Sequence, residues 1–208
     1  MNEPVNQKAD SGAGHTQLGI WVAAIAFFGG IAMLLAIWSR SDNPSTANSA
    51  PPAFRGEVRE FIPSSDPRPA PQTAFTTGEG QPTTLADARG RVLLVNFWAT
   101  WCVPCVQEMG SLDRVQGALG VEGLTVLAIS QDRNGIDAVR PFYDKLGLAN
   151  LGVYLDPKGT VAREFKVEAL PVSVIIDRDG REVGRLVGPA EWDSQQAVTL
   201  LRHYLESH

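Results

Sequence analysis

The stretch FWATWCVPC, residues 97–105, contains the only two cysteines of this 208-residue chain. It overlaps the apolar run RVLLVNFWA of residues 91–99, which predicts a central strand covered on both faces of a sheet. Apolar residues then recur with helical spacing over residues 104–119. The two cysteines therefore lie where a buried strand gives way to the first turn of a helix.

Such a pair could form a structural disulfide, half of a metal site or a reversible dithiol. A disulfide across so short a loop removes little entropy from the unfolded chain, so a purely structural role is disfavoured. A structural zinc site needs four ligands, and the three histidines, His15, His203 and His208, lie near the ends of the chain. A haem attachment site or a cysteine-protease site would also need a histidine close to the pair.

Dithiol exchange suits the position of the pair. Cysteines three residues apart in a first helical turn are within reach of a disulfide. The free amides and the dipole at the helix N-terminus favour the thiolate of Cys102, and the thiolate is the nucleophile. Cys105 lies deeper, so it would attack the mixed disulfide and release the substrate. We therefore predict a redox-active disulfide with Cys102 as nucleophile and Cys105 as resolving cysteine.

The surrounding pattern predicts a single α/β domain over residues 73–208, with a mixed central sheet flanked by helices. We expect a capping box at Asp193 and Gln196, which would begin the last helix, and a kink at Pro141. The expected elements, in order, are a hairpin over 74–85, a strand over 91–99, a helix over 104–119, a strand over 123–130, a helix over 135–148, a strand over 151–156, a short helix over 159–167, strands over 171–177 and 182–188, and a helix over 193–206.

Residues 18–38 form an uncharged apolar stretch, long enough to cross a bilayer as one helix. Trp21 and Trp38 lie near its two ends, where tryptophan favours the membrane interface. A cleaved signal peptide would have a shorter apolar region. We predict an uncleaved transmembrane anchor over 18–38, preceded by a short N-terminus over 1–17. The flanking charges do not fix its orientation, so the cytoplasmic placement of residues 1–17 follows from the predicted chemistry of the domain.

Residues 39–72 contain half of the chain's 14 prolines and predict a semi-extended linker. The segment FRGEVREFI, residues 54–62, could dock on the domain or on the membrane, and its sequence does not distinguish the two. The net charge of −5 and the lack of a basic patch argue against a nucleic-acid partner.

The motif FWATWCVPC, followed by QEM at 107–109 and by DPKGTVAREFKVEALPVSVIIDRDG at 156–180, resembles the TlpA/ResA/DsbE (CcmG) family of membrane-anchored thioredoxin-like thiol-disulfide oxidoreductases, the TlpA type most of all. The resemblance covers residues 73–205. It implies a thioredoxin-like fold with a β-α insertion over 135–155. It also implies a protein-disulfide reductase at the bacterial inner membrane, with its catalytic domain in the periplasm.

The resemblance also implies roles for residues around the pair. Pro171 matches a proline that is cis in thioredoxin-like proteins, and the Leu170 backbone before it would face Cys102. With Trp101, Val103 and Pro104, these two residues are expected to line the substrate groove.

Glu108 matches the acid of the family pattern C-x-x-C-x-x-E. It is expected to tune the pKa values of the cysteines and to accept the proton of Cys105. Asn96 stands where cytosolic thioredoxins carry a buried aspartate, and an amide cannot take that proton. Gly110 stands where the family usually has a proline that bends the active-site helix, so the resemblance leaves the shape of this helix open.

Val103 and Pro104 add no charge between the cysteines, which predicts a reducing potential. We expect no metal and no organic cofactor. The expected partners are periplasmic thiol proteins (apocytochrome c, a copper chaperone or an oxidase subunit) and a DsbD/CcdA-type membrane electron donor. Two alternatives stay open on the same fold: a thiol peroxidase that uses Thr100, or a copper-binding chaperone that uses His203 or His208.

Overall fold

The computed structural model describes residues 50–55 and 60–207. The predicted N-terminus over 1–17, the predicted anchor over 18–38 and the first part of the predicted linker lie outside these residues. Within the described ranges, no helix is both long enough and apolar enough to span a membrane.

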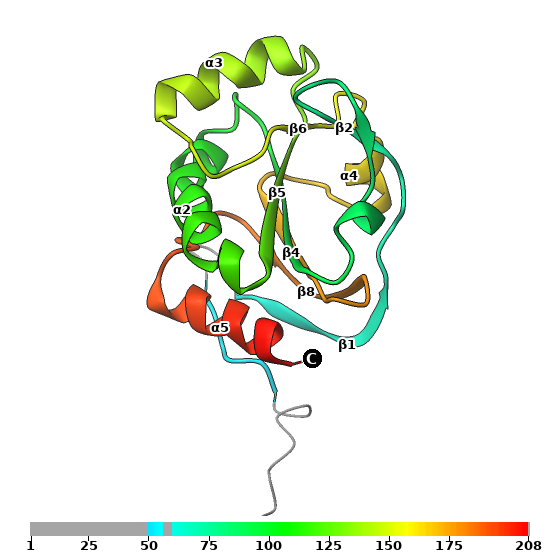
Figure 1. Ribbon diagram of the computed structural model, residues 1–208, viewed down its shortest axis with the longest axis vertical. Helices are drawn as coiled ribbons and strands as arrows, with labels where there is room; N and C mark the ends of the chain where they lie inside the picture. The colour runs from blue at the N-terminus through cyan, green and yellow to red at the C-terminus, as the bar shows by residue number, and fades with distance from the viewer. Residues whose placement is uncertain (1–49, 56–59, 208) are drawn as a thin grey trace, which may run out of the picture. The chain divides into compact units, whose positions relative to one another are not determined.

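A mixed sheet of eight strands forms the centre of the described domain, in the order β1-β8-β7-β4-β5-β6-β2-β3 (Figure 1). All residues of β4 are buried, and β4 pairs parallel with β5 and antiparallel with β7. The predicted central strand is therefore confirmed. The strands are β1 (Ile62–Pro69), β2 (Phe75–Thr77), β3 (Pro82–Thr83), β4 (Val92–Trp98), β5 (Leu124–Ser130), β6 (Tyr154–Leu155), β7 (Val172–Ile176) and β8 (Arg181–Val187).

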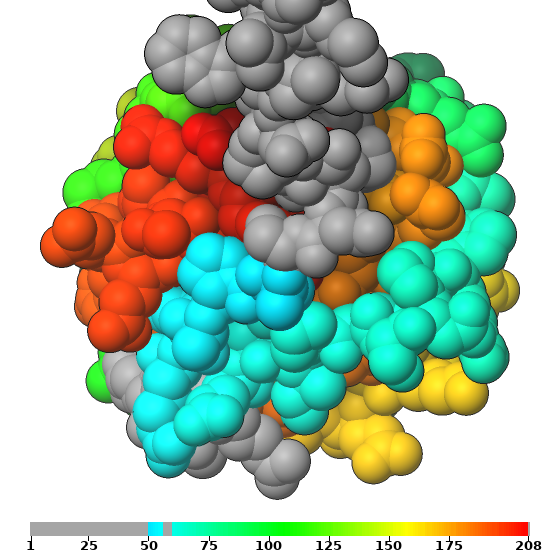
Figure 2. Space-filling view, turned by 90° about the horizontal axis from the view of Figure 1, so that it is seen from below, coloured from blue at the N-terminus to red at the C-terminus, as the bar shows by residue number. Residues whose placement is uncertain are grey.

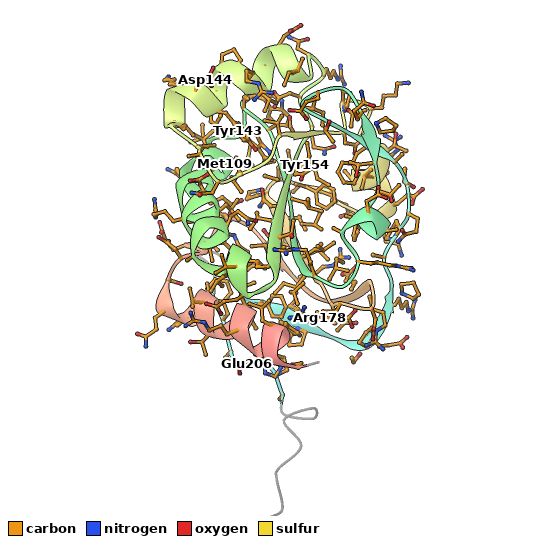
Figure 3. The ribbon with its side chains drawn as sticks, viewed as in Figure 1. Met109, Tyr143, Asp144, Tyr154, Arg178 and Glu206 are labelled. Atoms are coloured by element: carbon orange, nitrogen blue, oxygen red, sulfur yellow. A yellow bond between two sulfur atoms is a disulfide. The ribbon has the colours of Figure 1, made fainter. Side chains whose placement is uncertain are left out.

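Helices cover both faces of the sheet, as the sequence predicts. Alternate apolar residues of β4 belong to two separate core clusters, because successive side chains of a strand point to opposite faces. One cluster includes residues of α2, α3 and α5, among them Met109 and Tyr143 (Figure 3), and the other includes residues of α4. The helices are α2 (Val103–Leu119), α3 (Ile136–Leu146), α4 (Thr160–Glu164) and α5 (Gln195–Glu206), with short 3-10 turns η2 (Leu85–Ala88) and η3 (Gly120–Glu122).

The predicted linker is wrong in its second part, because the described residues before position 73 belong to the folded domain. β1 pairs antiparallel with β8 at the edge of the sheet. An edge strand tolerates proline, since its outward N–H groups need no partner in the sheet. Three of the prolines that indicated a tether, Pro63, Pro67 and Pro69, therefore lie in an edge strand.

The segment ahead of β1 docks on the domain, which settles the alternative that the sequence left open. Phe54 and Phe61 are buried, and their rings contact Trp192 and Tyr204 with centroids 5.4 and 6.2 Å apart. Figure 2 shows this segment against α5 and β8. Burial of two aromatic rings contributes several kcal/mol, since each fully buried ring adds about 1.5–3 kcal/mol.

Helix α5 begins one residue later than its predicted capping box. Ser194 is the N-cap, and its hydroxyl accepts a hydrogen bond from the Ala197 N–H at 3.3 Å. Asp193 instead accepts a hydrogen bond from the guanidinium of Arg114 on α2, which lowers the pKa of the Asp193 carboxyl. The predicted apolar face of this helix is confirmed as buried: Ala197, Leu200, Leu201, Tyr204 and Leu205.

Replacing Gly184 with alanine is expected to destabilise the domain by about 1–3 kcal/mol, the usual cost of overpacking. A Cβ at this position of β8 would lie 2.9 Å from the backbone oxygen of Ile62 and 2.7 Å from Cε1 of Phe61. Backbone cannot move aside as a flexible side chain can, so β1 or Phe61 would have to shift. Urea unfolding of the Gly184→Ala variant measures the loss.

Gly110 supplies a control, since replacing it with alanine is expected to raise stability instead of lowering it. Gly110 lies inside α2, which continues unbroken from Val103 to Leu119. A Cβ there would lie 3.1 Å from the end of the long Arg114 side chain, which can shift by a few tenths of an ångström and keep its bond to Asp193. Gly110→Ala is expected to raise stability by about 0.5–1 kcal/mol. Equal effects of the two substitutions would contradict the close approach of β1 to β8.

Candidate active site

The cysteine pair joins the end of β4 to the start of α2. Cys102 is the N-cap of α2, and Cys105 lies in its first turn. The two form a disulfide with their Cα atoms 5.3 Å apart. The Cys102 sulfur also accepts a hydrogen bond from the backbone N–H of Cys105, at 3.3 Å. A helix N-terminus thus surrounds the Cys102 sulfur with the partial positive charge that favours a thiolate.

The two sulfurs differ in access. Cys102 is 7% exposed and lines a groove of about 770 Å³, whereas Cys105 is fully buried and does not line it. An incoming disulfide can therefore approach Cys102 from the groove, while Cys105 lies behind it. The groove is lined by Trp101, Cys102, Val103, Pro104, Gln131, Gly159, Ala162, Arg163, Val167, Glu168, Ala169 and Leu170.

The structure brings four of the five predicted groove residues together around this groove. Trp101 and Val103 are 68% and 69% exposed, large apolar side chains left open to solvent on either side of Cys102. Leu170 faces them across the groove, with Pro104 at the start of the helix. Pro171 is buried instead, and its bond to Leu170 is cis, as the resemblance implies.

Sequence reasoning missed the part of the groove that comes from α4 and the loop after it. Ala162 and Arg163 on α4, and Val167 to Ala169 in the loop, face the cysteine loop. The signal available in the sequence was the run VEAL, residues 167–170, in which apolar residues directly precede Pro171.

Sequence reasoning also missed Asp132, which fixes the turn before the cysteines. Its buried carboxylate accepts hydrogen bonds from the Thr100 N–H at 2.9 Å, the Thr100 hydroxyl at 2.7 Å and the Ser130 hydroxyl at 2.8 Å. The Thr100 hydroxyl is therefore engaged by a carboxylate. The position of an acid just after β5, next to the end of β4, is the signal that could have found it.

The predicted acid, Glu108, is buried on α2 one turn after Cys105. Its carboxylate accepts hydrogen bonds from the side-chain amide of Asn96 at 2.8 Å and from the Ala190 N–H at 3.1 Å. Trp98, close to the pair in sequence, is a core residue that packs on Phe142 and Tyr143.

Of the three histidines, His203 alone lies among the described residues, whereas His15 and His208 lie outside them. His203 is in the last turn of α5, where burial lowers the pKa of its ring, and it contacts Tyr204. Among residues 50–55 and 60–207, no group of three or more histidine, cysteine, aspartate or glutamate side chains is placed to hold a metal ion.

The chain is similar to proteins of a known family. The family model described as AhpC/TSA matches residues 67–181. The thiol-disulfide oxidoreductase ResA of Bacillus anthracis is 33% identical over 119 residues, which are 57% of this chain and 68% of the relative. The thioredoxin-like protein YneN of Bacillus subtilis is 34% identical over 113 residues, 53% of this chain and 65% of the relative.

Solved structures of disulfide oxidoreductases have the same fold as this chain. A thiol:disulfide interchange protein DsbE from Chlorobium tepidum superposes with a TM-score of 0.61 at 29% identity, over 68% of this chain and 99% of that one. A secreted disulfide oxidoreductase of Mycobacterium tuberculosis, homologous to E. coli DsbE, superposes with a TM-score of 0.54 at 25% identity. The match covers 63% of this chain and 96% of that one. The predicted thioredoxin-like fold is confirmed. The chain therefore belongs to the AhpC/TSA family and is a thiol-disulfide oxidoreductase of the ResA/DsbE type, with a redox-active disulfide between Cys102 and Cys105.

Proposed function

We propose that this protein reduces disulfides of client proteins outside the cytoplasmic membrane. The observation that carries the proposal is the difference between the two sulfurs: Cys102 lines an apolar groove, whereas Cys105 is fully buried next to it. An extended client segment could lie between Trp101 and Leu170 with its disulfide at Cys102. A purely structural disulfide would need neither the groove nor this asymmetry.

The reaction is a two-electron exchange. The Cys102 thiolate attacks one sulfur of the client disulfide, which breaks that bond and expels a client thiolate. Cys105 then loses its proton to Glu108, and its thiolate attacks the Cys102 sulfur. The second client thiolate leaves, and the Cys102–Cys105 disulfide forms. The client disulfide is reduced and the protein dithiol is oxidised.

The residues around the pair have separate parts in this scheme. The amides at the start of α2 stabilise the Cys102 thiolate, with Pro104 placed where no N–H is needed. Trp101, Val103 and Leu170 contact the client, and Pro171 holds the Leu170 backbone at the groove.

The redox potential of the pair is expected to be reducing, near the value of about −270 mV found for thioredoxin. Val103 and Pro104 bring no positive charge that would stabilise the thiolate form. Equilibration of the protein with glutathione at known ratios, followed by thiol trapping, measures the potential. A value above about −180 mV, in the range of oxidases and isomerases, would contradict the reductase direction.

The predicted anchor over 18–38 supports a location at the bacterial inner membrane, with residues 1–17 in the cytoplasm and the catalytic domain in the periplasm. Tethering would raise the effective concentration of membrane-bound clients. Resemblance to the family points to clients in the maturation of cytochrome c or of the copper site of cytochrome oxidase. A DsbD/CcdA-type membrane protein would supply the electrons.

Trapping in membranes tests this function. The full-length Cys105→Ala variant lacks the resolving thiol, so it is expected to accumulate mixed disulfides between Cys102 and its clients. A Cys102→Ala, Cys105→Ala variant is the matched control and should capture nothing. If the single variant captures no thiol protein from the periplasmic side, the proposed function is wrong.

A further inference from the structure

A buried amide on β4 contacts the acid of the active-site helix. Asn96 is the one polar residue of β4, and it is fully buried, as is Glu108 apart from 2% of its surface. Burying two polar side chains in a core is costly unless they bond to each other or to other polar groups. The burial of Asn96 and Glu108 therefore depends on the hydrogen bonds that they make.

Fixed donors hold both carboxylate oxygens of Glu108. The Asn96 amide nitrogen donates to Oε1 at 2.8 Å, and the Ala190 N–H donates to Oε2 at 3.1 Å. Asn96 is itself fixed by β4, and its nitrogen also donates to the hydroxyl of Ser173, its partner in register on β7, at 2.9 Å. The carboxylate is thus held between the sheet and the loop before α5, one helical turn from Cys105.

The amide of Asn96 acts as a donor in this arrangement. Both hydrogens of its nitrogen are engaged, by Glu108 and by Ser173. Its Oδ1 atom is buried and accepts no hydrogen bond from any residue in the described part of the chain. A half-turn of the amide would bury both N–H groups without a described acceptor, so the orientation that donates to Glu108 is favoured.

We propose that Asn96 is a positioning residue for dithiol exchange, which holds the Glu108 carboxylate one helical turn from Cys105 so that it can take up the Cys105 proton. This inference rests on the proposed role of Glu108 as proton acceptor. The Cys105 proton passes to Glu108, the Cys105 thiolate closes the disulfide, and Glu108 later releases the proton to solvent.

Several other groups surround this acid. Cys105 lies one helical turn before it on α2, and the Ala190 N–H donates to it from the loop before α5. On the outer side of that loop, Arg114 pairs with Glu191 and Asp193. Asn96 and Ser173 do not ionise in the working range, so their effect must act through hydrogen bonds.

The test is the pH dependence of disulfide closure, measured as the rate at which oxidised glutathione oxidises the reduced protein. Asn96→Leu removes the hydrogen bond that stabilises the charged form of Glu108, so Glu108 gains a proton more easily. On the low-pH side of the rate profile, the pH at which the rate is half its maximum should therefore rise by roughly 1 pH unit. Asn96→Asp keeps the shape but adds a like charge, so it should raise the midpoint further. Gln116→Leu, which removes another side-chain amide of α2, one that accepts a hydrogen bond from the Val126 N–H on β5, should leave the profile unchanged.

Asn96→Leu in a Glu108→Gln background separates the two proposals. If Asn96 acts through Glu108, Asn96→Leu no longer shifts the profile once the acid is gone. Asn96→Asp is compared only with Glu108 present, because its own carboxylate takes up protons. If Glu108→Gln alone leaves the profile unchanged, the proposed proton acceptor is wrong, and the inference fails with it. If Glu108→Gln changes the profile but Asn96→Leu leaves it alone, or shifts it equally in the Glu108→Gln background, Asn96 does not position the acid. Asn96→Ala, which also removes the donor, preserves the test if Asn96→Leu does not fold.

Discussion

Replacing Cys102 with serine is expected to lower disulfide reduction by about a thousandfold or more, because the reaction then lacks its nucleophile. Replacing Cys105 with serine is expected to stop the reaction at a different point. Cys102 still lines the groove and can attack, but the mixed disulfide has no resolving thiol. Insulin reduction measures turnover, and mass spectrometry of the protein after reaction with a peptide disulfide shows where the cycle stops.

Val121→Ser is a suitable control, since Val121 is largely exposed in η3 and does not line the groove. It should leave turnover unchanged. The opposite pattern, with the mixed disulfide accumulating on Cys105 of the Cys102→Ser protein, would show that the assignment of the two cysteines is reversed.

Replacing Phe61 with alanine is expected to lower the free energy of unfolding by about 3–5 kcal/mol, the usual cost of deleting a buried aromatic ring. Phe61 is buried beside Tyr204, and the strand that follows it forms the edge of the sheet. Its loss would open a cavity between β8 and α5. Urea unfolding at neutral pH measures the effect.

The neighbouring residue provides a matched control. Ile62 is 63% exposed, so Ile62→Ala should change stability by no more than about 0.5 kcal/mol. Equal stabilities of the Phe61→Ala protein and the unsubstituted protein would show that the segment ahead of β1 is a tether after all.

Local patterns predicted most of the fold. The buried strand over 91–99, the helix after it and the hairpin near the C-terminus each follow from hydrophobic spacing and turn residues within a few positions. The disulfide geometry also follows from local spacing, because Cys102 and Cys105 share one helical turn.

The errors arose where the outcome depends on residues far apart in the chain. Prolines in an edge strand resemble prolines in a linker, and only the contacts of Phe54 and Phe61 with Trp192 and Tyr204 distinguish them. The start of the last helix shifted by one residue because Arg114, far away in sequence, engages Asp193.

In the active site, too, the local features were predicted and the contacts between distant residues were not. The sequence predicts the cysteines, Glu108 and the proline before β7. It could not predict that the Asp132 carboxylate binds Thr100 or that the Asn96 amide contacts Glu108, because both contacts depend on how one element packs against another. The half of the groove formed by α4 has the same origin.

A single-turnover experiment tests the central claim most directly. The fully reduced protein is mixed with an excess of a peptide disulfide, and free peptide thiols and protein thiols are counted by mass spectrometry after acid quenching. We predict that each protein molecule reduces one peptide disulfide and forms one Cys102–Cys105 disulfide, with no added cofactor. A reduced protein that keeps both thiols and leaves the peptide disulfide intact would contradict the account.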